Sequence, residues 1–229
     1  NWLMKIIGLT GSIGMGKTTA SSMIRNFGIP VHDSDRAVHA AFTDNSSAIC
    51  AIRKRFPEAV KDGVINRQKL GQLVLNNDMA IAELEGILHP IVKRDRCKFI
   101  RHYKAQQYFM VVIDVPLLFE TNIHNECFQT IVMSAPAAVQ TKRVLKRPGM
   151  TAEKFELVKL RQMPDEKKRS LGDIVILSHL GRRFTYNKLR NYFHSVRLQK
   201  YVKVKWKSRM EPHLDGFTRN RIRYGNNRS

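Results

Sequence analysis

An eight-residue run constrains this chain more than any other feature: Gly11-Ser12-Ile13-Gly14-Met15-Gly16-Lys17-Thr18 fits the pattern G-x-x-x-x-G-K-[ST] in full. A β-rich run, Lys5–Leu9, precedes it, and Lys17–Phe27 follows with helical spacing of its apolar residues. A glycine-rich loop in this position lets backbone N–H groups approach a phosphate closely. The N-terminus of the following helix adds further donors and a positive dipole end. The sequence therefore predicts a nucleotide phosphate site.

Two side chains of this run have expected roles in phosphate chemistry. Lys17 is expected to reach the β- and γ-phosphates, and the hydroxyl of Thr18 is expected to be a ligand of Mg²⁺. The Asn-Lys-x-Asp element typical of guanine-specific GTPases is missing, since Asn187-Lys188 is followed by Leu-Arg. Asp114 ends an apolar run and is either a magnesium-associated acid or a strand-end cap. Because Val115 follows it in place of a water-activating glutamate, transfer to an organic hydroxyl is favoured over hydrolysis.

The alternation of apolar runs with helical periodicity predicts an α/β fold. Strands are expected at 5–9, 29–32, 110–115, 130–133 and 173–177, and helical segments between them imply a five-stranded parallel sheet flanked by helices. The stretch 36–107 reads as almost wholly helical, with breaks at Asp62-Gly63 and at His89-Pro90. It is too long for a simple crossover, so we expect an inserted helical subdomain. A last helix is expected after Gly181, with its apolar pattern ending near residue 197.

Two carboxylates follow the second predicted strand. Asp33 and Asp35 lie near the carboxyl edge of the sheet, where ligands bind in open α/β folds. A carboxylate there can orient an acceptor hydroxyl and receive its proton. Each could equally cap the helix that follows.

Composition and charge limit the cellular location and the partners that we expect for the chain. No apolar run approaches the ~18 residues of a membrane-spanning helix, no secretory leader is recognisable, and the three cysteines are widely spaced. We therefore expect a cytoplasmic protein without a membrane partner. The net charge is +21, and 14 of the 40 Lys and Arg residues lie after Gly181. A nucleic-acid role for the basic tail 197–229 is a separate hypothesis, with at most non-specific binding expected.

A family resemblance covers roughly residues 5–181. The run from Gly8 to Thr19 closely resembles the opening of dephospho-CoA kinases, and Val31-His32-Asp33-Ser34-Asp35 stands where that family has Asp-x-Asp. Val115-Pro116-Leu117-Leu118-Phe119-Glu120 is the most specific of the remaining matches. Further matches follow in order along the chain: Asp62-Gly63 with Arg67 and Leu70, Leu88-His89-Pro90, Gln140 with Arg143 and Arg147, Gln162, and Gly172 to Ile176.

The resemblance implies a P-loop kinase fold that transfers the γ-phosphate of ATP, with Mg²⁺, to the ribose 3′-hydroxyl of dephospho-CoA. It implies Lys17, Asp35 and Arg143 as catalytic residues, with Asp35 as the preferred base. It implies nucleotide contacts from Gly11, Ser12, Ile13, Gly14, Met15, Gly16, Lys17, Thr18, Thr19 and Arg147. The acceptor would be bound by Asp33, Asp35, Arg67, His89, Pro90, Leu117 and Glu120.

The same resemblance suggests a single kinase domain at 4–196. Its core would comprise 4–35, 109–136 and 172–196, with a CoA-binding insertion at 36–108 and a lid at 137–171. The basic tail 197–229 is expected to be poorly ordered, and the protein to be a monomer or weak oligomer.

Purely structural roles are open alternatives for several of these residues. His89 could cap a helix or bind a backbone carbonyl, and Pro116-Leu117-Leu118 could be core packing. Arg143 and Arg147 are four residues apart on one helix face, where like charges repel unless an anion lies between them. The alternative function is that of another P-loop kinase, acting on a nucleoside or small alcohol.

Overall fold

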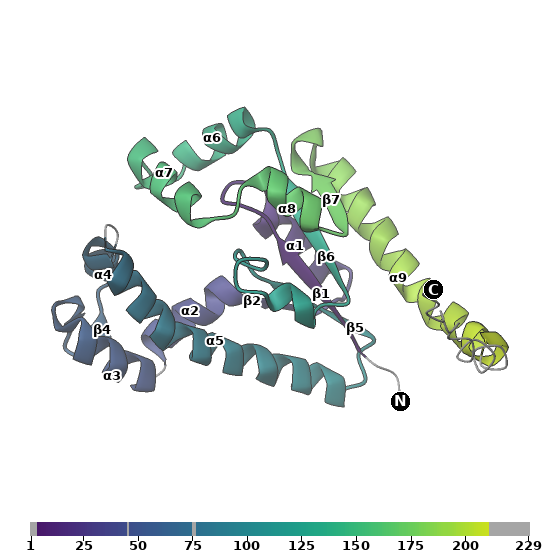
Figure 1. Cartoon of the computed structure of the whole chain (residues 1–229), viewed down its shortest axis with the longest axis horizontal. Coiled ribbons are helices and arrows are strands. Elements are labelled where there is room, and N and C mark those ends of the chain that lie inside the picture. The colour runs from purple at the N-terminus through teal and green to yellow at the C-terminus, as the bar shows by residue number, and fades with distance from the viewer. Residues whose placement is uncertain (1–3, 45, 75–76, 211–229) are drawn as a thin grey trace, which may run out of the picture. The chain divides into compact units, whose positions relative to one another are not determined.

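The computed structural model describes residues 4–44, 46–74 and 77–210, and its centre is a five-stranded parallel sheet (Figure 1). The strand order is β2-β5-β1-β6-β7. The strands are β1 (Lys5–Thr10), β2 (Val31–Asp33), β5 (Met110–Asp114), β6 (Gln129–Ser134) and β7 (Ile174–Leu177). The predicted α/β class and the five parallel strands are thereby confirmed.

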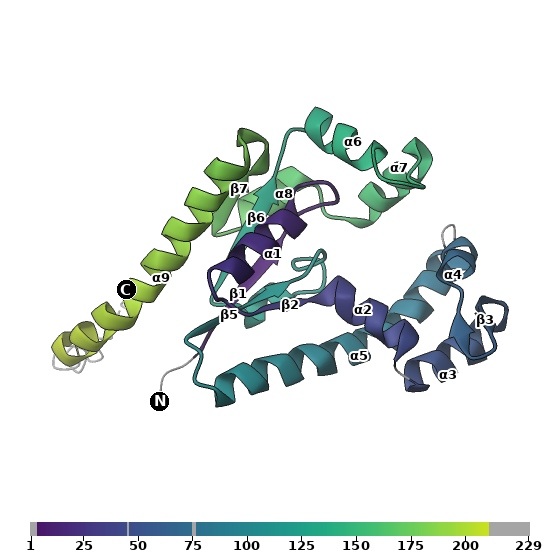
Figure 2. The ribbon, with the colours of Figure 1, turned by 180° about the vertical axis from the view of Figure 1, so that it is seen from behind.

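The sheet is buried because helices cover both of its faces. All five residues of β5 are buried, which explains the continuous apolar run in the sequence. Helix α1 (Lys17–Asn26) lies on one face and α8 (Asp165–Leu171) on the other, as Figure 2 shows from behind. Since β1, β2 and β5 are parallel neighbours, the chain segments that follow them emerge at the same edge of the sheet.

The insertion between β2 and β5 has its own apolar core, formed by Ala41, Ala48, Ile52, Phe56, Ala59, Ile65, Leu70, Val74, Ala80 and Leu88. Its helices are α2 (Ser34–Thr43), α3 (Ser46–Arg55), α4 (Arg67–Val74) and α5 (Asp78–Ala105), with the short 3₁₀ turn η1 (Pro57–Ala59). The sequence predicts an almost wholly helical stretch here, but the insertion also contains two short strands. An antiparallel hairpin of β3 (Val60–Lys61) and β4 (Val64–Ile65) turns at Asp62-Gly63, where both residues have positive φ.

The expected break at His89-Pro90 is wrong, because α5 runs through it from Asp78 to Ala105. Proline inside a helix removes one backbone hydrogen bond and costs about 3 kcal/mol. The helix continues because the buried side chain of Leu88 and the half-buried side chain of Ile91 pack on the insertion core, and tertiary packing supplies most helix stability in proteins.

The segment predicted as a lid contains three helices: α6 (Ala137–Leu145), α7 (Ala152–Arg161) and α8. Helix α8 was not expected from the sequence. Short 3₁₀ turns, η2 (Ile123–Glu126) and η3 (Ser178–Leu180), follow β5 and β7.

The last described helix, α9 (Arg182–Met210), extends beyond residue 197, where the apolar pattern ends. Neither proline nor glycine interrupts this stretch, so helix propensity is maintained without amphipathic spacing. The chain divides into two compact units between Leu189 and Arg190, within this helix. Residues 211–229 of the predicted tail lie outside the described residues. Among the described helices, none is both long and apolar enough to cross a membrane.

Candidate active site

Three glycines in the loop between β1 and α1 have positive φ, which glycine adopts more readily than other residues, and the first is Gly11 with φ 154°. Gly14 has φ 78° and Gly16, the N-cap residue of α1, has φ 90°. A Cβ on Gly14 would lie 2.6 Å from a methyl carbon of Val144. Because Gly16 has no side chain to cap α1, the first N–H groups of the helix are available to an anion.

This loop lines a cavity of about 520 Å³. All nine residues from Gly11 to Thr19 line it, as do the predicted Asp35, Arg143 and Arg147. The cavity wall also contains residues that were not among the predicted site residues: Pro116, Val158, Gln162, Ser178, Arg182 and Thr185. The structure therefore brings the predicted nucleotide residues together around one space.

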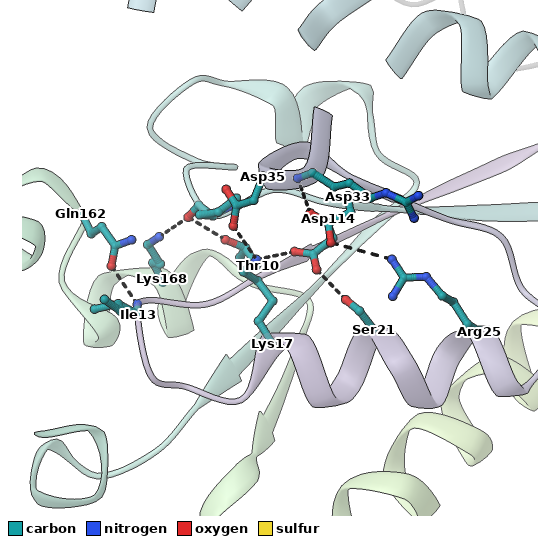
Figure 3. Close-up of polar contacts among 12 residues, drawn as sticks. Thr10, Ile13, Lys17, Ser21, Arg25, Asp33, Asp35, Asp114, Gln162 and Lys168 are labelled. Atoms are coloured by element: carbon teal, nitrogen blue, oxygen red, sulfur yellow. Dashed lines mark hydrogen bonds and ion pairs between the residues drawn. The ribbon is translucent and has the colours of Figure 1, made fainter. Parts of the chain in front are cut away.

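Lys17 lies between two carboxylates (Figure 3). Its Nζ is 2.6 Å from Oδ1 of Asp114 and 3.9 Å from Oδ2 of Asp35. The other oxygen of Asp114 accepts a hydrogen bond of 2.5 Å from the Ser21 hydroxyl, and Asp114 is 2% exposed. Asp114, for which the sequence left two roles open, thus holds the Lys17 ammonium at the floor of the cavity.

Asp35 is the more accessible of these two acids. Its side chain keeps 66% of its surface open to solvent, so a ligand in the cavity can reach it. The surrounding cavity walls desolvate its carboxyl and raise its pKa above the usual value, an effect that the Lys17 ammonium partly offsets. A carboxylate with a raised pKa is a better proton acceptor than an ordinary aspartate.

A second cavity of about 340 Å³ adjoins the first. Its wall contains Asp35, His89 and Leu117 from the predicted acceptor set, and most of the remaining wall is apolar. Arg96 and Arg161 contribute the cationic groups of this wall. Asp35 lines both cavities and so stands where ligands in the two spaces meet.

Four predicted acceptor residues have other surroundings, and none of them is among the residues that line these two cavities. Asp33 caps α2 by accepting from the Arg36 N–H at 3.0 Å, as the alternative interpretation proposed. A guanidinium nitrogen of Arg67 lies 3.0 Å from Nε2 of His39, and Pro90 lies inside α5. Glu120 binds the Met163 N–H at 2.7 Å. Substrate contact by these four residues stays a prediction.

Arg143 connects the phosphate loop to the segment after β7. Its guanidinium donates to the Gly14 carbonyl at 3.3 Å and to the Ser178 hydroxyl and carbonyl at 2.8 and 3.3 Å. Arg147 lines the same cavity but lies beyond the end of α6 at Leu145, so the expectation that the two arginines share one helix face is wrong. Two guanidinium groups at the cavity wall fit an anionic ligand better than a solvated helix face.

A buried ion pair behind the site was not foreseen. Lys168 of α8 is fully buried, and its Nζ lies 2.9 Å from Glu120 Oε1 and donates to the Pro116 carbonyl at 2.7 Å. Burial lowers the pKa of Lys168, and the Glu120 carboxylate opposes that shift. No sequence signal distinguishes this lysine, because its neighbours in α8 are charged and mostly exposed.

Phosphate-binding donors and an accessible carboxylate meet at the carboxyl edge of the parallel sheet, where a second ligand can reach both. The class of protein that combines these features is the P-loop kinases. Comparison with known families agrees: CoaE, described as Dephospho-CoA kinase, matches residues 5–181. The chain belongs to the dephospho-CoA kinase family.

Individual relatives support the same assignment. The chain is 46% identical over 166 residues to a dephospho-CoA kinase of Paramagnetospirillum magneticum, covering 72% of this chain and 78% of the relative. It is 43% identical to a dephospho-CoA kinase of Rhodospirillum rubrum, covering 81% and 88% of the two chains. A crystal structure from Thermus thermophilus matches with a TM-score of 0.71 at 29% identity, over 86% of this chain and 97% of that one. The dephospho-CoA kinase from Campylobacter jejuni shares the fold, with a TM-score of 0.59 at 20% identity, over 84% and 97%.

Proposed function

We propose that this protein phosphorylates dephospho-CoA: it transfers the γ-phosphate of ATP to the ribose 3′-hydroxyl, giving coenzyme A and ADP. The family membership supports this activity. The observation that carries the mechanism is the position of Asp35, which lines both the phosphate-loop cavity and the adjoining cavity. A donor in one space and an acceptor in the other would meet beside a single carboxylate.

Several groups around the first cavity would bind the triphosphate together. The loop N–H groups and the start of α1 bind phosphate oxygens, and Lys17 carries a positive charge to the β- and γ-phosphates. Lys17 is held by the buried carboxylate of Asp114 at 2.6 Å, which fixes the position of its ammonium. Arg143 and Arg147 add positive charge to the wall of the same cavity.

Transfer needs an acceptor oxygen and a place for its proton. The acceptor hydroxyl donates to Asp35, its oxygen forms the new P–O bond, and the bond from the γ-phosphorus to the bridging oxygen of ADP breaks. Asp35 receives the proton late, because a loose transition state requires positioning more than a strong base. An acceptor bound in the second cavity would displace water from beside Asp35.

Magnesium enters as part of the nucleotide substrate. When bound, Mg²⁺ neutralises charge on the β- and γ-phosphate oxygens. The Thr18 hydroxyl fits it, because it is a hard oxygen donor at the cavity wall beside the phosphate loop. The proposal also includes action in the cytoplasm as a monomer or weak oligomer, without a specific nucleic-acid partner.

The test is an ADP-release assay across a panel of hydroxyl acceptors. We expect ADP only with dephospho-CoA, and a loss of at least ~100-fold in kcat for Lys17→Ala, the size of effect seen when one donor to a developing charge is removed. Lys61→Ala, an exposed lysine of the β3–β4 hairpin, is the matched control and retains activity. Phosphorylation of a nucleoside or another small alcohol in preference to dephospho-CoA would support the alternative kinase instead.

A further inference from the structure

The two peptide groups that flank Cα of Ile13, in the phosphate loop, are each held by a glutamine side chain. The Ile13 N–H donates to Oε1 of Gln162 at 2.9 Å, and the Ile13 carbonyl accepts from Nε2 of Gln140 at 2.8 Å. Figure 3 shows the Gln162 contact. Gln140 lies in α6 and is 7% exposed, and Gln162 is the C-cap of α7.

Both glutamines belong to the segment predicted as a lid: Gln140 lies within α6, and Gln162 follows the last residue of α7. Each amide uses a different atom: Gln162 accepts through its oxygen and Gln140 donates through its nitrogen. The two contacts therefore restrain two successive peptide planes, Ser12–Ile13 and Ile13–Gly14, and with them the backbone conformation of Ile13. Arg143 adds a third contact from the same segment, to the next carbonyl of the loop, Gly14.

A glycine-rich loop needs such restraint if it is to bind phosphate well. Its glycines allow many backbone conformations, and only one directs the N–H groups of residues 14–18 to a common point. A loop held in that conformation before binding loses less conformational entropy when ATP arrives.

We propose that Gln140 and Gln162 are positioning residues for ATP, which act through the backbone N–H and carbonyl of Ile13 to hold the phosphate loop in its binding conformation. Neither amide needs to touch the reacting atoms. This inference rests only on the nucleotide part of the proposed function.

Met163, the residue after Gln162, contacts Glu120, a residue of the predicted acceptor set. The Met163 N–H donates to Glu120, which follows β5 and is paired with Lys168. Gln162 itself lines both cavities. The Gln162-Met163 pair thus anchors the C-terminal end of α7 both to the phosphate loop and to the loop that follows β5.

Two substitutions of identical chemistry test the proposal. Gln162→Glu keeps an oxygen that can accept from the Ile13 N–H, whereas Gln140→Glu loses the N–H that donates to the Ile13 carbonyl. Each adds one negative charge, but Gln162 lines the nucleotide cavity and Gln140 is not among the residues of its wall, so charge alone predicts the larger weakening for Gln162→Glu. The measurement is calorimetric binding of a non-hydrolysable ATP analogue with Mg²⁺, without any acceptor.

We expect Gln140→Glu to weaken analogue binding about tenfold more than Gln162→Glu, the effect of one lost hydrogen bond to a buried group. Dephospho-CoA affinity, measured separately, should change less than twofold in Gln140→Glu, because Gln140 is not among the residues that line the second cavity. Equal weakening by the two variants would overturn the proposal.

A second pair of substitutions, which adds no charge, tests the proposal even if a buried glutamate at position 140 prevents folding. Gln140→Met and Gln162→Met remove the two hydrogen bonds without adding charge, and each should weaken analogue binding about tenfold. Gln72→Met, on the exposed face of α4, is the control with unchanged binding. Unchanged binding in both position-140 and position-162 variants would also overturn the proposal. Analogue binding without activity on dephospho-CoA would contradict the proposed function and leave this inference standing.

Discussion

At the scale of single residues, the site depends on how two carboxylates share Lys17. Asp114 is buried and both of its oxygens are taken, by Lys17 and by Ser21, so it is poorly placed to receive a proton from a ligand. Asp35 contacts Lys17 only at 3.9 Å and remains open to the cavity. The geometry therefore favours Asp35 as the base, as the family resemblance implied.

Replacing Asp35 tests that role. Asp35→Asn keeps the size of the side chain but cannot accept a proton, so we expect kcat to fall about 100-fold or more. Steady-state kinetics with dephospho-CoA check this, with Asp44→Asn on the exposed end of α2 as control. A fall of less than about threefold would exclude Asp35 as the base.

The pH dependence of activity follows from the same group. The reactive form is the carboxylate, and desolvation raises its pKa, so activity should be lost as the pH falls through a value above that of an ordinary aspartate. A profile of kcat/KM against pH should therefore show an acid limb in the unchanged protein. That limb should be absent from the residual activity of Asp35→Asn, and its persistence there would assign it to another group.

At the scale of elements, α8 shows that a short polar helix can be attached to the core through one buried side chain. Its sequence, Asp-Glu-Lys-Lys-Arg-Ser-Leu, looks solvent-exposed, yet Lys168 is fully buried against Glu120 and the Pro116 carbonyl. These partners lie about fifty positions earlier in the chain, beyond the reach of local periodicity. The sequence therefore could not predict the contact.

Lys168→Met should destabilise the fold by about 3 kcal/mol, because it leaves the Glu120 carboxylate partly buried without its cation. Chemical denaturation measures the free energy of unfolding. Lys167→Met, at the exposed neighbouring position, should change it by less than about 0.5 kcal/mol. Adding Glu120→Gln to Lys168→Met should recover part of the loss, since the unpaired charge is then removed. Equal losses in the two single lysine variants would refute the buried pair.

Elements with strong local signals were predictable, and those determined by distant packing were not. The loop from Gly11 to Thr18 and the helix that begins at Lys17 follow directly from the residue pattern. Pro90 predicted a break that the packing of α5 overrides, and the two-residue strands of the β3–β4 hairpin are too short to leave a pattern. The turn at Asp62-Gly63 was the one usable signal for that hairpin.

At the scale of the whole molecule, the parallel sheet is what assembles the site. The phosphate loop, Asp35 and Asp114 are far apart in sequence, but they follow or end neighbouring strands at one edge. Parallel topology made their proximity predictable. The contacts of Gln140 and Gln162 with Ile13 were not, because the sequence matches at these positions carried no information on which backbone atoms they bind.

The central claim is that the phosphoryl group reaches one particular hydroxyl of one acceptor. Incubation with ATP, Mg²⁺ and dephospho-CoA, followed by phosphorus NMR and mass spectrometry of the product, locates the new phosphate directly. The account predicts a monoester on the ribose 3′-oxygen, formed together with ADP. A phosphate on another hydroxyl, or ADP formed with dephospho-CoA left unmodified, would contradict it.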